Sequence, residues 1–361
     1  VDWRDNKTVY SGSQFGAYSR QNLVTKERKS VRPTRDLGEP AVRYNWQSPI
    51  LLSRHNQDVF YFGSNKFHRS MSKGDSLVTL SNDLTTNPVQ GDVPFGTTTT
   101  ISESPIRFGL IYVGTDDGNV QMTRDGGKTW TNFRGKIPGM PVGAWIPQVQ
   151  ASRFNAGEAF VVANDYRRGD FKPYIFRTTD YGKTWTRLLD EKKAVGYALC
   201  VLQDPTEPNL IFAGTEHGLW VSLDNGASFQ QWKNGYPSVS TYDLAIQERE
   251  ADLAIATFGR ALWVLDDIRP LRKLAANKGM LNNAITAFEA PTAVQAQIKN
   301  APGYEWSTWG IWDADNRPTG AHISYYIKSA TDTSSKAKKD TVAVQIFDAN
   351  NEVIRNLKWA A

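Results

Sequence analysis

The chain has 361 residues and a formal net charge of +5, from 42 Lys and Arg against 37 Asp and Glu. The basic residues are scattered rather than gathered in one long run, which argues against nucleic acid as a partner. No apolar run approaches the roughly 18 residues that a membrane-spanning helix needs, so we expect no transmembrane segment. With 12 Trp, 14 Tyr and 16 Phe, the chain can fill a large core instead.

Cysteine, histidine and phosphate-binding patterns point to no catalytic or metal chemistry. Cys200 is the only cysteine and lies in an apolar run, so we expect a buried thiol and no disulfide within the chain. The four histidines show no ligand spacing. Neither a Gly-x-Ser-x-Gly elbow nor a phosphate-binding loop is present. The sequence therefore predicts no metal site and no cofactor.

From the N-terminus onward, one phrase recurs: an apolar run leads into Gly-Thr or Gly-Ser and then a turn. Runs of β-branched and aromatic residues that end in such turns predict strands. No segment before Asp267 has the period of a convincing amphipathic helix. The phrase occupies residues 9–16, 59–65, 111–118 and 211–218, with a divergent copy at 159–165 and a looser one at 253–259.

A second phrase, the Asp-box Ser/Thr-x-Asp-x-Gly-x-Thr/Ser-aromatic, occurs at 123–130, 178–185 and 222–229, with a degenerate copy at 70–77. Its Asp can accept hydrogen bonds from N–H groups of its own turn, and its Gly supplies the positive φ that the turn needs. The closing aromatic residue starts a strand and buries its ring. We therefore assign structural roles to Asp125, Gly127, Trp130, Asp180, Gly182, Trp185, Asp224, Gly226 and Phe229.

The two phrases together define a repeating module of about four short strands. Periods of roughly 45–55 residues with four strands each are typical of β-propeller blades. The sequence therefore predicts an all-β fold, with a multi-bladed propeller of four-stranded blades over residues 1–267. About six modules fit there, and the first lacks its opening strand. We expect the remaining blades to come from the same protein or from another chain.

After Asp267 the character of the sequence changes. Residues 268–286 read as a linker with a short helix or connector. Strand candidates follow at 292–298, 320–328 and 341–348, and a polar Ser/Thr/Lys loop separates the last two. These features predict part of a β-sandwich of the fibronectin type III kind over residues 287–361.

The order of these phrases resembles bacterial Asp-box (BNR) repeat proteins of the sortilin-like kind, which are large envelope or secreted proteins of Bacteroidota type. Residues 241–246 and 250–267 look like the last blade and exit of that family, and residues 325–328 look like its following domain. The likeness covers nearly the whole chain. More distantly, the chain resembles the sortilin propeller and the tandem propellers of family 74 xyloglucanases. The resemblance implies an extracytoplasmic protein of the periplasm, outer-membrane surface or exterior.

Binding residues are expected at the turn between the second and third strands of each blade. This turn emerges opposite the Asp-box turn, on the face that also carries the loops between blades, and loops are where function concentrates. The turn residues differ from module to module, unlike the Asp-boxes. The candidates are Gln14, Phe15, Asn65, Lys66, Asp117, Asn164, Asp165, Tyr166, His217 and Phe258.

Asp116 and Glu216 form the one well-placed acidic pair among these turns. A glycosidase needs two carboxylates on either side of the scissile bond. The likeness to xyloglucanases implies a catalytic Asp in a Thr-Asp-x-Gly phrase, which is present at residues 115–118. At the corresponding N-terminal turn, Gln14 cannot act as acid or base. Asp116 and Glu216 are therefore hypothetical acid and base, and the alternative is that they hydrogen-bond within their own turns.

Tryptophans in irregular segments offer a platform for sugar or peptide. Trp145, Trp306, Trp309 and Trp312 lie among Gly and Pro residues rather than in clean strands. The alternative for the last three is packing between the propeller and the C-terminal domain.

The structural phrases repeat fully, whereas no catalytic set stands out. We therefore predict a non-catalytic binding or scaffolding propeller of the cell envelope that engages a protein or glycan through the face opposite the Asp-boxes. One alternative is a xyloglucanase-like glycoside hydrolase whose cleft is shared with a second propeller. The other is a sortilin-like peptide receptor.

Overall fold

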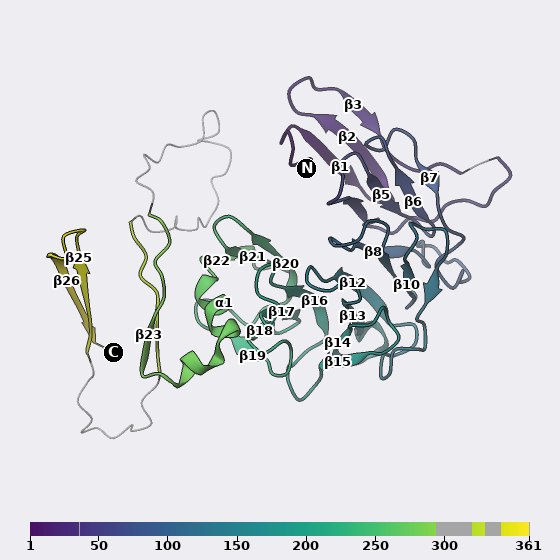
Figure 1. The fold of residues 1–361 in the computed structure, drawn as a ribbon. Helices are drawn as coiled ribbons and strands as arrows, with labels where there is room; N and C mark the ends of the chain where they lie inside the picture. Colours follow the sequence, from purple (N-terminus) through teal and green to yellow (C-terminus); the bar gives the residue numbers. More distant parts are fainter. Residues whose placement is uncertain (36, 294–319, 329–340, 361) are drawn as a thin grey trace. The chain divides into compact units, whose positions relative to one another are not determined.

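The computed structural model describes residues 1–35, 37–293, 320–328 and 341–360 (Figure 1). The chain forms two compact units, Val1–Ile268 and Arg269–Ala361. The predicted aromatic platform at Trp306, Trp309 and Trp312 lies outside the described residues.

Antiparallel sheets follow one another along the first unit. Its described residues form a three-stranded sheet, four four-stranded sheets and a final three-stranded sheet, and consecutive strands pair as hairpins within each. Short apolar runs separated by turn residues favour this local pairing. The sheets are β1 (Thr8–Ser13), β2 (Ala17–Asn22) and β3 (Arg28–Ser30); β4 (Ile50–Leu52), β5 (Phe60–Gly63), β6 (Phe67–Ser70) and β7 (Val78–Thr79); β8 (Thr98–Glu103), β9 (Ile111–Thr115), β10 (Val120–Thr123) and β11 (Thr131–Asn132); β12 (Trp145–Ala151), β13 (Ala159–Asp165), β14 (Asp170–Thr178) and β15 (Thr186–Leu189); β16 (Ala198–Gln203), β17 (Ile211–Thr215), β18 (Gly218–Ser222) and β19 (Gln230–Trp232); and β20 (Thr241–Gln247), β21 (Asp252–Thr257) and β22 (Leu262–Leu265).

The opening strands of the five later sheets, β4, β8, β12, β16 and β20, line a common channel. The other strands of each sheet follow outward from this channel in chain order. Figure 1 shows the sheets succeeding one another around an arc from β1 to β22. This arrangement confirms the predicted all-β propeller with four-stranded antiparallel blades.

Side chains of one inner strand cap the free edge of the next inner strand. An inner strand has a sheet neighbour on one side only, so its remaining N–H groups need other acceptors. The preceding sheet supplies them, which ties consecutive blades together at the channel wall. These bonds run from Val149 N–H to Thr100 Oγ1 (3.3 Å), from Ala151 N–H to Ser102 Oγ (3.0 Å), from Val201 N–H to Gln148 Oε1 (2.6 Å) and from Gln203 N–H to Gln150 Oε1 (3.0 Å).

Each Asp-box forms the turn between the third and fourth strands of its blade. The Asp125 carboxylate accepts hydrogen bonds from the N–H (2.9 Å) and hydroxyl (2.7 Å) of Thr129 and from the hydroxyl of Thr123 (2.8 Å). Asp180 and Asp224 accept the same set in their own copies. The glycines of the three turns all take positive φ: 101° at Gly127, 80° at Gly182 and 84° at Gly226.

The aromatic residue that closes each Asp-box packs against the preceding sheet. Trp130 meets Phe67 edge-on with ring centroids 5.4 Å apart, and Trp185 meets Phe133 at 5.6 Å. Phe229 packs against the apolar layer between the fourth and fifth sheets. Because such rings bury large apolar areas, the motif fixes the spacing of neighbouring blades.

In the second unit, helix α1 (Arg269–Ala276) and the 3₁₀ helix η2 (Lys278–Asn282) follow directly on the propeller, within the predicted linker. Pro270 lies in the first turn of α1, where a missing N–H costs nothing. Two antiparallel strand pairs follow, β23 (Ile285–Ala287) with β24 (Tyr325–Ile327) and β25 (Thr341–Phe347) with β26 (Val353–Ala360). The predicted fibronectin-like sandwich stays a prediction. No helix in the described ranges has the length and hydropathy needed to cross a membrane.

Candidate binding face

The turns between second and third strands and the Asp-box turns lie at opposite ends of each sheet, because consecutive hairpins reverse direction. We call the end opposite the Asp-boxes the upper face. The loops that lead into the inner strands reach it too. Asp116 N–H donates to Thr97 C=O, and Glu216 N–H donates to Tyr197 C=O, each with an N···O distance of 3.0 Å. Two kinds of loop therefore build the upper face together.

Asp116 holds the loop that enters its own blade. Its side chain is only 3% exposed. One carboxylate oxygen accepts from Thr97 N–H (2.8 Å) and the other from the Thr97 hydroxyl (2.6 Å), with Asn45 Nδ2 at 3.5 Å. Burial raises the pKa of Asp116 to about 6, although the hydrogen bonds from Thr97 act in the opposite direction. The alternative to catalysis was that Asp116 hydrogen-bonds within its own turn. Its carboxylate instead bonds the entry loop, 19 residues earlier in the chain, and so has a structural role of a different kind.

Asp117 is also buried, at 4% exposure, and ties a second loop. One of its carboxylate oxygens accepts from both the N–H and the hydroxyl of Thr86, each over 2.7 Å, and the other accepts from the Thr115 hydroxyl. Arg134 donates to the Asp117 carbonyl. Of the predicted candidates, Asp117 therefore faces the protein rather than a ligand.

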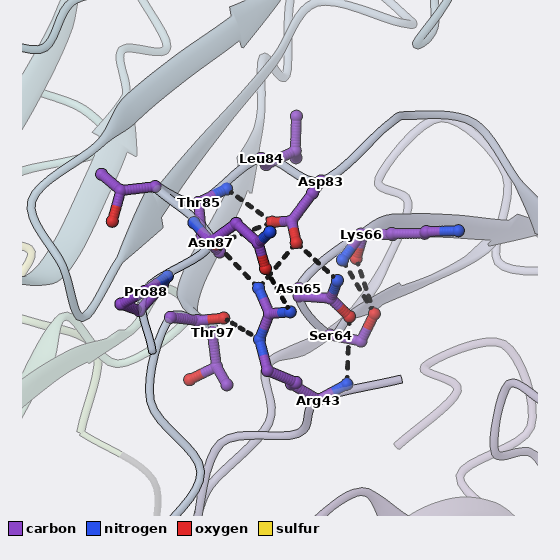
Figure 2. Close-up of polar contacts among 12 residues, drawn as sticks. Arg43, Ser64, Asn65, Lys66, Asp83, Leu84, Thr85, Asn87, Pro88 and Thr97 are labelled. Carbon is purple, nitrogen blue, oxygen red and sulfur yellow. Dashed lines mark hydrogen bonds and ion pairs between the residues drawn. The ribbon is translucent and has the colours of Figure 1, made fainter. Parts of the chain in front are cut away.

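Asn65 organises the corresponding turn of the second sheet (Figure 2). Its amide oxygen accepts from Arg43 N–H (3.0 Å), and its amide nitrogen donates to Asp83 (2.9 Å). The Arg43 guanidinium then bonds Asp83 (2.6 Å) and Thr85 (2.9 Å). Asn65 is 4% exposed, so it supports the loop that follows β7.

Three further candidates lie near the first two sheets, and two of them, Lys66 and Phe15, have partners within the protein. Lys66 pairs with Glu39 at 2.9 Å. Gln14 is exposed. Phe15 packs edge-on against Trp46, with ring centroids 5.3 Å apart. These residues lie over the first and second sheets, apart from the aromatic group described next.

An aromatic strip crosses the upper face from the fourth sheet to the fifth. The rings of Tyr166 and Tyr197 stack with centroids 4.4 Å apart and planes inclined at 22°. The Arg167 guanidinium lies 4.3 Å from the ring centroid of Trp145 and 4.5 Å from that of Tyr166. Phe171 is 55% exposed, and its ring centroid lies 6.3 Å from that of Tyr197. Two predicted candidates, Trp145 and Tyr166, thus form part of one surface.

Tyr166 is placed by a short 3₁₀ turn, Tyr166–Arg168, which ends at Gly169 with φ of 83°. Asp165 fixes this turn, because its carboxylate pairs with the Arg168 guanidinium at 2.6 and 2.9 Å. Asn164 is 2% exposed and donates to the Ala198 carbonyl, 3.4 Å away on the fifth sheet. Asp165 and Asn164 therefore position the strip rather than extend it.

A hollow lies at each end of the strip. The inner one, which we call the upper mouth, is the upper end of the channel, has a volume of about 350 Å³ and includes Trp145 and Tyr242 in its wall. The outer hollow, of about 580 Å³, is lined by Phe171, Glu216 and His217 among others. An extended ligand can therefore lie across the Tyr166–Tyr197 stack and reach a hollow on either side.

Glu216 and His217 lie together at the outer hollow, with His217 Nε2 3.7 Å from the Glu216 carboxylate. Glu216 belongs to the fifth sheet, whereas Asp116 belongs to the third. Phe258, the candidate of the last sheet, is 76% exposed, and its ring centroid lies 6.4 Å from that of Tyr242.

The sequence did not predict the strip residues Tyr197, Arg167 and Phe171, nor Tyr242 in the wall of the upper mouth. Tyr197 and Tyr242 stand at or just before the start of an inner strand, at the same sheet end as the predicted turns. Aromatic residues at the starts of the inner strands could therefore have been added to the candidates, which were drawn mainly from the turns between second and third strands.

Comparisons with known proteins place this geometry in context. No protein-family model matches the sequence. The chain is 31% identical over 110 residues to an oligoxyloglucan-reducing end-specific xyloglucanase of Emericella nidulans, a stretch that covers 30% of this chain and 13% of that protein. It is 24% identical over 220 residues to a protein of Neosartorya fischeri assigned the same activity, covering 55% and 26%. The chain thus spans about a quarter or less of these relatives.

Two solved structures share the fold. One is a family 74 xyloglucanase from Xanthomonas campestris, with a TM-score of 0.56, 16% identity and coverage of 74% of this chain and 44% of that one. The other is the extracellular domain of a protein assigned as a hybrid two-component system from B. thetaiotaomicron, with a TM-score of 0.52, 12% identity and coverage of 73% and 33%. At these identities the likeness shows the propeller fold and no activity.

Proposed function

We propose that the chain is a non-catalytic binding propeller that engages a protein or glycan through its upper face. The observation that carries this proposal is the aromatic strip at the surface. In it Tyr166 stacks on Tyr197, the Arg167 guanidinium lies over the rings of Trp145 and Tyr166, and Phe171 lies beside Tyr197. Flat rings offer large contact areas at low conformational cost, and Trp, Tyr and Arg dominate binding hot spots. Sugar rings and peptide side chains both pack on such surfaces.

The place of action that we propose is outside the cytoplasm, at the bacterial envelope or beyond it. This proposal rests on similarity. One solved structure with the same fold is an extracellular domain of a bacterial protein. Further propeller sheets, from this protein or another chain, are proposed as neighbours of the last sheet, where Leu262 is 73% and Val264 61% exposed.

A glycoside hydrolase is the second candidate, and the two xyloglucanase relatives favour it. The hydrogen bonds of Asp116 weigh against it, because that carboxylate is occupied by Thr97 and hidden from solvent. A sortilin-like peptide receptor is the third candidate, and it would use the same strip.

A glycan array together with reducing-sugar release from xyloglucan separates these proposals. Binding without sugar release supports the binding module, and release of reducing sugar overturns it in favour of the hydrolase. If release occurs, an unchanged rate in Asp116→Asn excludes Asp116 as an acid or base. Tyr197→Ala must weaken binding, while Phe154→Ala must not. Phe154 is a matched control because it is 40% exposed and lies in the turn between β12 and β13, at the Asp-box end.

A further inference from the structure

Asp243 is the only charged residue in the lining of the upper mouth, within the described part of the chain. The remaining wall is made of polar and apolar side chains such as Asn45, Gln47, Gln148, Trp145 and Tyr242. No Lys, Arg or His of the described chain joins this wall. A lone carboxylate therefore faces an otherwise uncharged hollow.

A repeated irregularity of the inner strands explains how Asp243 comes to face the hollow. Each of β8, β12, β16 and β20 carries a register shift near its start, and the next paired residues are Thr100, Gln148, Cys200 and Asp243. Such bulges re-aim side chains. These four residues therefore occupy equivalent positions in successive blades.

The first three of these residues are engaged with the next blade. Thr100 and Gln148 accept from the next inner strand, as described above, and the Cys200 thiol lies 3.7 Å from the Thr241 carbonyl. Asp243 instead accepts from the N–H of its own neighbour Leu244 at 2.8 Å. That bond occupies one carboxylate oxygen, and the second oxygen has no protein partner in the described chain.

The surroundings of Asp243 favour a positive charge. Asp243 is exposed to the hollow, but the protein around it partly desolvates the carboxylate and raises its pKa, and no neighbouring cation lowers it. Tyr242 is 54% exposed beside it. Trp145, which belongs to the same wall, already has the Arg167 guanidinium 4.3 Å from its ring centroid, so a guanidinium can pack on the face of this ring.

We propose that the upper mouth is a subsite for one cationic group, the guanidinium or ammonium of a peptide segment of a protein partner. Asp243 supplies the charge-assisted hydrogen bond, and Trp145 and Tyr242 supply the aromatic walls. This inference rests on the proposed binding function of the upper face and narrows its ligand to a basic peptide. A metal ion fits poorly, because the described residues hold no group of three or more His, Cys, Asp or Glu side chains that could ligate one.

The test compares two blocked peptides that differ only in charge. Acetyl-Gly-Arg-Gly-amide and its citrulline counterpart, which replaces the guanidinium by a neutral urea of the same shape, are titrated into the protein and followed by NMR. We expect the arginine peptide to bind about tenfold more tightly, and Asp243→Asn to bring the two affinities together. The Asn side chain keeps an oxygen for Leu244 N–H, so folding is preserved, and a thermal melt verifies this.

Asp92→Asn is the matched control, because Asp92 is an exposed carboxylate in the loop between β7 and β8 and its removal changes the net charge equally. It must leave the tenfold preference intact. Equal binding of the two peptides by the parent protein overturns the inference. So does the absence of binding of either peptide up to 10 mM, a concentration roughly a hundred times a dissociation constant of about 0.1 mM for the arginine peptide. If Tyr197→Ala still weakens glycan or protein binding in that case, the proposed function stands and only the cationic subsite falls.

Discussion

The rings of Tyr166 and Tyr197 stack 4.4 Å apart although they belong to different blades, one in the turn after β13 and the other just before β16. An aromatic pair of this kind contributes about 0.5–1.5 kcal/mol beyond the area it buries. The stack therefore adds little to the free energy that holds the two blades together, and it leaves ring surface exposed between the two hollows. The cost of removing it should appear in ligand binding more than in stability.

Tyr197→Ala is expected to weaken ligand binding at the upper face at least tenfold and to lower the free energy of unfolding by only about 1–2 kcal/mol. Calorimetric titration of the ligand found by array screening, with urea unfolding of the same samples, measures both effects. Tyr197→Phe retains the ring and should keep both the ligand affinity and the free energy of unfolding of the parent protein. A variant that loses several kcal/mol of stability while binding normally would assign the stack a structural role alone.

The buried carboxyl group of Asp116 should make the folded protein more stable at acidic pH. Its folded-state pKa is raised to about 6, above the ordinary aspartate pKa of 3.8, so the folded protein holds this proton more tightly than the unfolded chain does. The stabilisation is fully present at pH below about 4 and is lost as the pH rises through about 6. Its size is on the order of 2–3 kcal/mol.

The measurement is the difference in unfolding free energy between the parent protein and Asp116→Asn, taken by urea titration at several pH values. We expect this difference to move in favour of the parent protein as the pH falls from 7.5 to 4.5, because only the parent gains a proton at this site. A difference that stays constant over that range would contradict the raised pKa.

The sequence predicted those parts of the fold that depend on local chemistry. The Asp125 turn could be read from its own eight residues, because the carboxylate, its donors and the Gly with positive φ all lie within them. The buried state of Asp116 could not, because its donor Thr97 is 19 residues away in the chain. Likewise, the Tyr166–Tyr197 stack arises only when two blades pack together. Sequence periodicity placed residues at the correct end of a blade, but the partners across blades determined which of them face solvent.

Gly182 in the second Asp-box should be far less replaceable than Gly135 in the loop after β11. Both have positive φ, 80° and 69°, so Ala introduces backbone strain of about 1 kcal/mol at either position. At Gly182 the added methyl group would also run into the ring of Phe133 on the preceding sheet, whereas nothing lies within 4 Å at Gly135. We therefore expect Gly182→Ala to cost about 2–4 kcal/mol in total and Gly135→Ala about 1 kcal/mol. Chemical denaturation measures both, and equal costs would show that the sheets can move apart to accept the methyl group.

Arg153 and Glu248 face each other across the Asp-box end of the channel and link the fourth sheet to the sixth. The guanidinium donates to both carboxylate oxygens, at 2.9 and 2.5 Å, and Arg54 of the second sheet approaches the same carboxylate at 3.9 Å. The side chains of Arg153 and Glu248 are 28% and 55% exposed, so water and salt screen the pair. A double-mutant cycle with Arg153→Ala and Glu248→Ala should therefore give a coupling energy of about 0.5–1 kcal/mol that shrinks as salt is raised. A coupling of 3 kcal/mol or more, unchanged at 1 M salt, would mean instead that the three sheets close tightly around a dry ion cluster.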